Sequence, residues 1–158
     1  MRLWVEAVRG LIFPVGRPPR PWVRLVAPFC ARCAEPYARH SPGNFLCRNC
    51  AGRRWALERV RAAYRAVGTV REVILRFKYE REYSLRPWLG RWMRDGFRQY
   101  YAEERWDALV PVPLFRARRK ERGFNQSAEI AEWLGQEVGI RVEEGLARVR
   151  ETPPQARL

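Results

Sequence analysis

Residues 108–126 read Ala-Leu-Val-Pro-Val-Pro-Leu-Phe-Arg-Ala-Arg-Arg-Lys-Glu-Arg-Gly-Phe-Asn-Gln. The apolar run 108–113 predicts a short strand that ends where its prolines cannot donate ladder hydrogen bonds. A helix is predicted over 125–139, with Asn125 as its N-cap and Gly139 as its C-terminal stop. A strand followed by a loop and a helix is typical of an α/β unit.

Further elements are predicted on both sides of this unit. Residues 140–142 favour a second strand, so we expect an α/β fold with a parallel sheet. Upstream, apolar residues at helical spacing predict a helix from about residue 70 to 78, and Ser84 with Pro87 begins another helix that carries an apolar stripe. The segment 60–66 alternates weakly and fits either a strand or the end of a helix.

A loop is predicted over 114–123, between the strand and the helix, and five of its residues 116–122 are cationic. Open α/β sheets bind ligands at the carboxyl ends of their strands, and a helix N-terminus favours an anion. Gly123 permits a positive φ and a close backbone approach to phosphate. The pattern fits an anion-binding loop and a merely solvated charge run about equally well.

The whole chain is strongly basic. Its 158 residues contain 31 Lys and Arg against 17 Asp and Glu, a net charge of +14, and 47% of them are hydrophobic. This composition predicts one packed domain, or a small module attached to one, whose partners are nucleic acid, phosphorylated small molecules or anionic lipid. A genomic bias toward arginine would produce the same composition. No run approaches the ~18 apolar residues of a membrane span, so we expect a cytoplasmic protein.

Two Cys-x-x-Cys pairs, Cys30/Cys33 and Cys47/Cys50, are separated by 13 residues. Each short gap lets a turn aim two thiolates at one point, and two pairs supply the four ligands of a closed, structural zinc site. Redox-active or free thiols are the alternatives, and four sulfurs alone do not distinguish zinc from iron. His40, between the pairs, is interpreted as a loop residue.

The motifs Val110-Pro-Val-Pro-Leu114 and Arg122-Gly-Phe-Asn-Gln126 resemble the signature of the ComF family of competence proteins, which are phosphoribosyltransferase-like. Besides the cysteine pairs, three segments fit the same family: Leu11-Ile-Phe-Pro14, Ile74-Leu-Arg-Phe-Lys-Tyr79 and Thr152-Pro-Pro-Gln155. A proline-rich insertion from Val15 to Pro28 departs from the family pattern. The resemblance implies a four-cysteine zinc ribbon followed by the first half of a type I phosphoribosyltransferase-like domain.

By this resemblance, 114–123 would be the pyrophosphate loop of a site for phosphoribosyl pyrophosphate, with Mg²⁺ bridging the donor oxygens. Its pyrophosphate-binding residues would be Arg118, Lys120, Arg122 and Gly123, and the secondary candidates are Lys78, Tyr79, Asn125 and Gln126. Family members continue into an acidic and Thr-Thr-Gly loop that binds the ribose 5-phosphate. This chain ends at Leu158 before that loop, so catalytic residues stay unassigned and we expect no transferase activity from this chain alone.

The interpretation divides the chain into an N-terminal segment with a proline-rich linker (1–28), a zinc ribbon (29–53) and a phosphoribosyltransferase-like domain (54–158). The expected function is that of a ComF-like competence protein in DNA uptake and natural transformation, which binds phosphoribosyl pyrophosphate through 114–123. The alternative is a non-catalytic zinc-ribbon module that binds single-stranded DNA, with DNA-uptake proteins as further partners.

Overall fold

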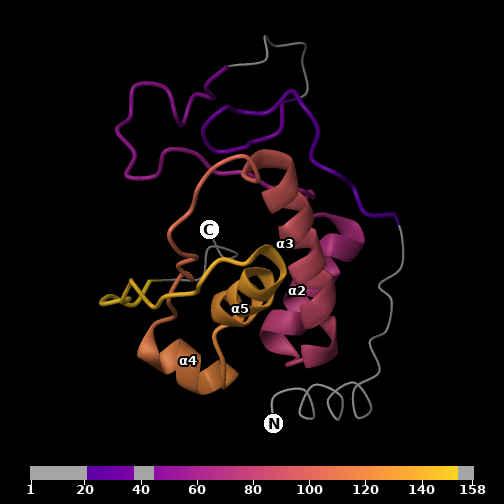
Figure 1. The fold of residues 1–158 in the computed structure, drawn as a ribbon, viewed down its shortest axis with the longest axis vertical. Helices are drawn as coiled ribbons and strands as arrows, with labels where there is room; N and C mark the ends of the chain where they lie inside the picture. Colours follow the sequence, from indigo (N-terminus) through magenta and orange to yellow (C-terminus); the bar gives the residue numbers. More distant parts are fainter. Residues whose placement is uncertain (1–20, 38–44, 153–158) are drawn as a thin grey trace.

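The computed structural model describes residues 21–37 and 45–152 (Figure 1). Its helices are α2 (Gly68–Tyr79), the 3-10 helix η1 (Tyr83–Leu85), α3 (Arg86–Tyr100), α4 (Arg116–Arg122) and α5 (Gln126–Val138). The cysteine-bearing segment forms a lobe of loops beside the C-terminal end of α3, and α4 lies toward the opposite end of the molecule (Figure 1). The motif at 11–14, His40 and residues 153–155 of the C-terminal motif lie outside the described residues.

The helices predicted over 70–78, from Ser84 and over 125–139 are confirmed as α2, α3 and α5. Asn125 caps α5 by accepting a hydrogen bond from the backbone N–H of Ser127, and Gly139 ends the helix in the left-handed conformation. None of the helices in the described ranges is long and apolar enough to cross a membrane.

The hydrophobic core lies where α2, η1 and α3 meet Phe124, two residues before α5. Its buried residues are Val70, Val73, Phe77, Leu85, Leu89, Trp92 and Phe124. The spacing of three or four residues between core positions within each helix explains why the apolar pattern of the sequence predicted α2 and α3 correctly. Met93, in the same apolar stripe, is 52% exposed and lies outside this core.

α3 also packs against α5. Gly90 on α3 lies so close to Trp133 on α5 that a Cβ atom at this position would overlap the indole ring. Two ion pairs flank the contact, Arg86 with Glu129 at 3.4 Å and Arg94 with Glu137 at 3.0 Å. The glycine therefore sets how closely the two helices approach.

The parallel sheet predicted from the sequence is not shown in the described residues. Instead of a strand over 108–113, Leu109 forms one isolated parallel bridge with Val142, held by two backbone hydrogen bonds of 2.8 and 3.0 Å. Pro111 and Pro113 have no N–H to donate, so the ladder does not extend along this segment. The predicted pairing of the two segments is present, but only as a single bridge.

The segment 60–66 pairs with the chain that enters the cysteine lobe. Tyr64 forms an antiparallel bridge with Arg24, and the N–H of Leu25 donates to the carbonyl of Ala63 at 2.9 Å. The segment therefore forms neither of the two structures that the sequence allowed, a strand or the end of a helix, but a single bridge within otherwise irregular chain.

The predicted loop over 114–123 is largely the helix α4, so this prediction was wrong. Arg, Ala, Lys and Glu are all strong helix formers, and the run Arg116–Arg122 contains nothing else. Gly123 ends the helix with φ 79° and donates its N–H to the carbonyl of Arg119, which confirms the positive φ expected there.

Candidate metal centre and anion site

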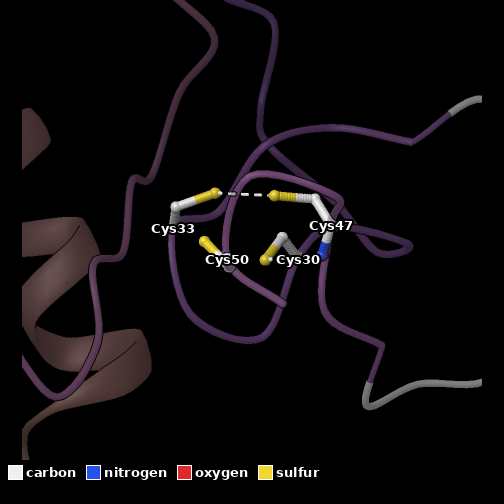
Figure 2. Close-up of side chains that lie close together, drawn as sticks. All are labelled: Cys30, Cys33, Cys47 and Cys50. Carbon is white, nitrogen blue, oxygen red and sulfur yellow. Dashed lines mark hydrogen bonds between the residues drawn. The ribbon is translucent and has the colours of Figure 1, made fainter. Parts of the chain in front are cut away.

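The four cysteine sulfurs converge inside the lobe of loops (Figure 2). The Sγ atoms of Cys30, Cys33, Cys47 and Cys50 all lie within 4.8 Å of one another, and those of Cys33 and Cys47 are 3.6 Å apart. All four are free thiols. A tetrahedral ion with metal–sulfur bonds of about 2.3 Å needs sulfurs about 3.8 Å apart, so the cluster fits a four-thiolate metal site.

Tight turns bring each pair of sulfurs together. The N–H of Ala34 donates to the carbonyl of Cys30 at 3.0 Å, and that of Cys50 donates to the carbonyl of Cys47 at 2.9 Å. Ala34 and Gly52 follow the two pairs with φ values of 60° and 72°. Small residues tolerate this backbone conformation best, and it turns the chain back beneath the sulfurs.

The thiols differ in their pKa values. Burial raises the pKa of Cys30, but hydrogen bonds from the backbone of Cys33, Cys47 and Arg32 outweigh it and lower this pKa to about 6. Burial raises the pKa of Cys33, and burial with hydrogen bonds among the thiols raises that of Cys50 to about 12. Cys33 and Cys50 are therefore harder to deprotonate than free thiols, and a metal bound here must displace their protons.

The predicted pyrophosphate residues lie on α4 and at its end. Arg118 pairs with Glu121 of the same helix at 3.4 Å. Lys120 is exposed and Arg122 is half-buried, and within the described ranges neither forms an ion pair with a carboxylate. The cationic side of α4 is therefore largely uncompensated.

The last turn of α4 meets the last turn of α2. The guanidinium of Arg122 lies over the ring of Tyr79, 4.9 Å from its centroid. Burial lowers the pKa of Lys78, and the positive charge of Arg122 lowers it further. Arg81 fixes the same contact by donating to the carbonyl of Glu121 at 2.7 Å. The structure thus joins one primary candidate, Arg122, to two secondary candidates.

The other two secondary candidates begin α5. Besides capping the helix, Asn125 donates to the carbonyl of Val112 at 3.2 Å, so its side chain has a structural role. Gln126 is 5% exposed, and its Nε2 has no hydrogen-bond partner among the described residues. A buried amide without a partner is costly, which marks Gln126 as a donor that a ligand could satisfy.

A cavity of about 390 Å³ beside α3 was not predicted from the sequence. Its lining includes the segment 57–63 except Val60, and Trp92, Met93 and Phe97 of α3. The apolar stripe of α3 could have indicated this cavity, because it contains more apolar residues than the side of α3 that faces the core. Met93 and Phe97, for example, line the cavity.

The fold and the cysteine cluster define a basic protein whose named elements, in the described residues, are helices, with a four-cysteine module that can hold a metal ion. Competence protein ComFC of Bacillus subtilis (strain 168) is 27% identical to this chain over 117 residues, which are 70% of the chain and 47% of that protein. The chain is therefore related to the ComF family, as its motifs predict, and spans about half the length of this relative. No family model and no solved structure matches it.

Proposed function

We propose that α4 and the residues around it bind a phosphorylated ligand of the phosphoribosyl pyrophosphate class. One observation carries this proposal: α4 places five cations between the segment 108–113 and the N-terminus of α5, and among the described residues only Arg118 of the five has a carboxylate partner. Charge-assisted hydrogen bonds to phosphate oxygens would offset this excess of positive charge. The relationship to ComFC supports a role in competence. We propose that the chain acts in DNA uptake and that it does so in the cytoplasm.

Arg122 and Lys78 are the side chains that we assign to the anion. The lowered pKa of Lys78 reflects burial together with the repulsion from Arg122, and an oxyanion between the two would raise this pKa again because it stabilises the charged amine. Stacking on Tyr79 holds the Arg122 guanidinium in place. The buried side-chain amide of Gln126, four residues after Arg122, would be a further, uncharged hydrogen-bond donor for the ligand.

Mg²⁺ would arrive on the diphosphate rather than on protein ligands. Within the described ranges, the four cysteines are the one cluster of metal-ligating side chains, and Glu121 on α4 is paired with Arg118. The chain would therefore contribute cations that stabilise the negative charge of a pyrophosphate group.

We also propose that the cysteines hold a structural zinc ion. Four thiolate ligands leave no coordination position for a substrate, so the metal would organise the loops and take no part in chemistry. Mass spectrometry of the native protein should find one zinc per chain, and replacement of Cys50 by Ser should remove it.

The phosphate site is tested by calorimetric titration of phosphoribosyl pyrophosphate in the presence of Mg²⁺. We expect saturable binding that Arg122→Ala weakens about tenfold or more, because a charge-assisted bond is worth about 1.5–3 kcal/mol. Arg98→Ala is the matched control, since Arg98 is exposed in the last turn of α3. This end of α3 lies away from α4 (Figure 1). Equal affinities of wild type and Arg122→Ala would contradict the assignment.

A second candidate function is binding of single-stranded DNA by the cysteine module. Arg53, Arg54 and Trp55 follow the second cysteine pair and are all exposed, with Trp55 48% exposed. Cations that contact phosphates beside an aromatic ring that stacks on bases are typical of such surfaces. Affinity for an oligonucleotide should fall steeply as salt rises. No binding even in low salt would exclude this function.

A further inference from the structure

Arg61 connects the first cysteine turn to the rest of the protein. Its Nη1 donates to the carbonyl of Ala31 at 2.8 Å and to the carbonyl of Val60 at the same distance. Ala31 lies between Cys30 and Cys33 in the sequence, so this bond ends on the backbone that positions two of the four sulfurs.

The same guanidinium lies beside two aromatic rings that contact each other. It is 5.9 Å from the ring centroids of both Phe29 and Tyr100, and the two rings meet edge to face at 6.2 Å. Phe29 directly precedes Cys30, and Tyr100 is the last residue of α3. Cation–π contacts of this kind stabilise a fixed orientation of the arginine, which here joins the cysteine lobe to α3.

A second hydrogen bond attaches Val60, the residue before Arg61, to the same cysteine turn. The N–H of Val60 donates to the carbonyl of Arg32 at 2.6 Å. Both Val60 and Arg61 are thus hydrogen-bonded to carbonyls that lie between the first two cysteines. The position of this part of the chain depends on the conformation of the cysteine turn.

Residues 57–63, which include Arg61, form one wall of the 390 Å³ cavity beside α3. Trp92, Met93 and Phe97 of α3 belong to the rest of its lining. A change in the cysteine turn would therefore move one wall of an apolar cavity relative to the rest of its lining.

We propose that Arg61 couples metal binding at the four cysteines to the shape of this cavity. A metal ion holds together a stretch with few apolar residues, and without it the carbonyls of Ala31 and Arg32 lose their fixed positions. The wall 57–63 is then released and the aromatic residues of the cavity become accessible. By linkage, any apolar group that fills the closed cavity raises the metal affinity. This coupling requires neither the phosphate site nor DNA binding.

Hydrogen–deuterium exchange on the full chain, with zinc and after treatment with EDTA, tests the coupling. We expect faster exchange of 57–63 and of the last turn of α3 once zinc is removed, and unchanged exchange in the core of α2. Arg61→Leu should retain one zinc per chain, but its segment 57–63 should exchange fast even with zinc bound. Arg65→Leu is the control, because Arg65 is exposed in the adjoining segment and does not line the cavity.

The coupling is overturned if 57–63 exchanges at the same rate with and without zinc in the wild type, a comparison that needs no variant to fold. It is also overturned if Arg61→Leu keeps the zinc-dependent protection of the wild type. If Arg61→Leu fails to fold, Tyr100→Leu removes one ring from the contact and should reduce the protection partly. Full protection in a zinc-loaded Tyr100→Leu protein would contradict the role of the ring contacts.

Discussion

The guanidinium of Arg122 lies over the ring of Tyr79, so the C-terminal turn of α4 rests on the C-terminal turn of α2. Cations interact favourably with the negative end of a helix dipole, which explains how two helix ends can carry Lys78 and Arg122 side by side. The pKa of Lys78 is nevertheless lowered, by burial and by Arg122. The helix dipoles therefore compensate these positive charges only in part. This contact is therefore both a structural joint and the centre of the proposed anion site.

Replacing Lys78 by Met should stabilise the fold and weaken anion binding. The charged amine is partly buried beside another cation, so its removal should raise the free energy of unfolding by at most about 1 kcal/mol, given its partial exposure to solvent. Affinity for pyrophosphate should fall at the same time. Thermal denaturation with and without pyrophosphate measures both effects, and a variant that is less stable yet binds as well as wild type would contradict the assignment.

The pH dependence of stability provides a second readout for Lys78. Its folded-state pKa lies below the ordinary value of 10.5, so between these two values the unfolded chain binds more protons than the folded chain. Stability contributed by this group therefore rises with pH through that window. The Lys78→Met variant should lack this contribution when denaturant titrations of the two proteins are compared at several pH values below 10.5.

Replacing Gln126 by Met should also stabilise the ligand-free protein. The amide is buried and its Nε2 has no partner in the described part of the chain, so an apolar side chain of similar shape removes an unsatisfied donor. We expect a gain of about 1–2 kcal/mol in urea denaturation. If the ligand accepts a bond from this amide, the gain should disappear in saturating phosphoribosyl pyrophosphate. A destabilised variant would show that Gln126 has a structural role.

Gly90→Ala should destabilise the contact between α3 and α5. The added methyl group would overlap the ring of Trp133, and overpacking of this kind costs about 1–3 kcal/mol. Gly96→Ala on the same helix is the control, because its Cβ would meet the Cβ of Ala63 at 3.3 Å and needs only a small adjustment. Equal melting temperatures of the two variants would contradict the close packing described for α3 and α5.

Removal of the metal should leave the helices folded. The core of Val70, Val73, Phe77, Leu85, Leu89, Trp92 and Phe124 contains no cysteine and lies outside the lobe. Treatment with EDTA should therefore preserve the far-UV circular dichroism signal of the helices while the lobe becomes sensitive to protease. Loss of the entire helical signal would show that the lobe is needed for the fold of the rest.

Local patterns predicted much of the structure. The spacing of the cysteine pairs was sufficient to predict that the four sulfurs meet. Each Cys-x-x-Cys turn directs two sulfurs to one point, and one metal ion can bind the sulfurs of both turns. Asn125 and Gly139 identified the two ends of α5. The side chain of Asn125 caps the first turn, and Gly139 ends the helix in the left-handed conformation, so both effects are local. The periodic apolar residues of α2 and α3 reported directly on the side of each helix that faces the core.

Features that depend on distant contacts were missed. The charges of Arg116–Arg122 suggested a loop, but helix propensity decides the backbone of a run that has no core side. The apolar run 108–113, with the β-branched residues Val110 and Val112, indicated a strand. In the described part of the chain it forms only one bridge, between Leu109 and Val142. Arg61 has no local signature, because its role arises from contacts 30 residues away at Ala31 and at the end of α3.

Phosphorus-31 NMR of phosphoribosyl pyrophosphate with the wild-type protein tests the central claim most directly, because it resolves the diphosphate from the 5-phosphate. If the cations of α4 and Lys78 hold the diphosphate, its two resonances should shift and broaden as protein is added, while the 5-phosphate resonance changes little. The Lys78→Met/Arg122→Met double variant should abolish the effect. A shift confined to the 5-phosphate, or no shift of any resonance, would contradict an anion site at the end of α4.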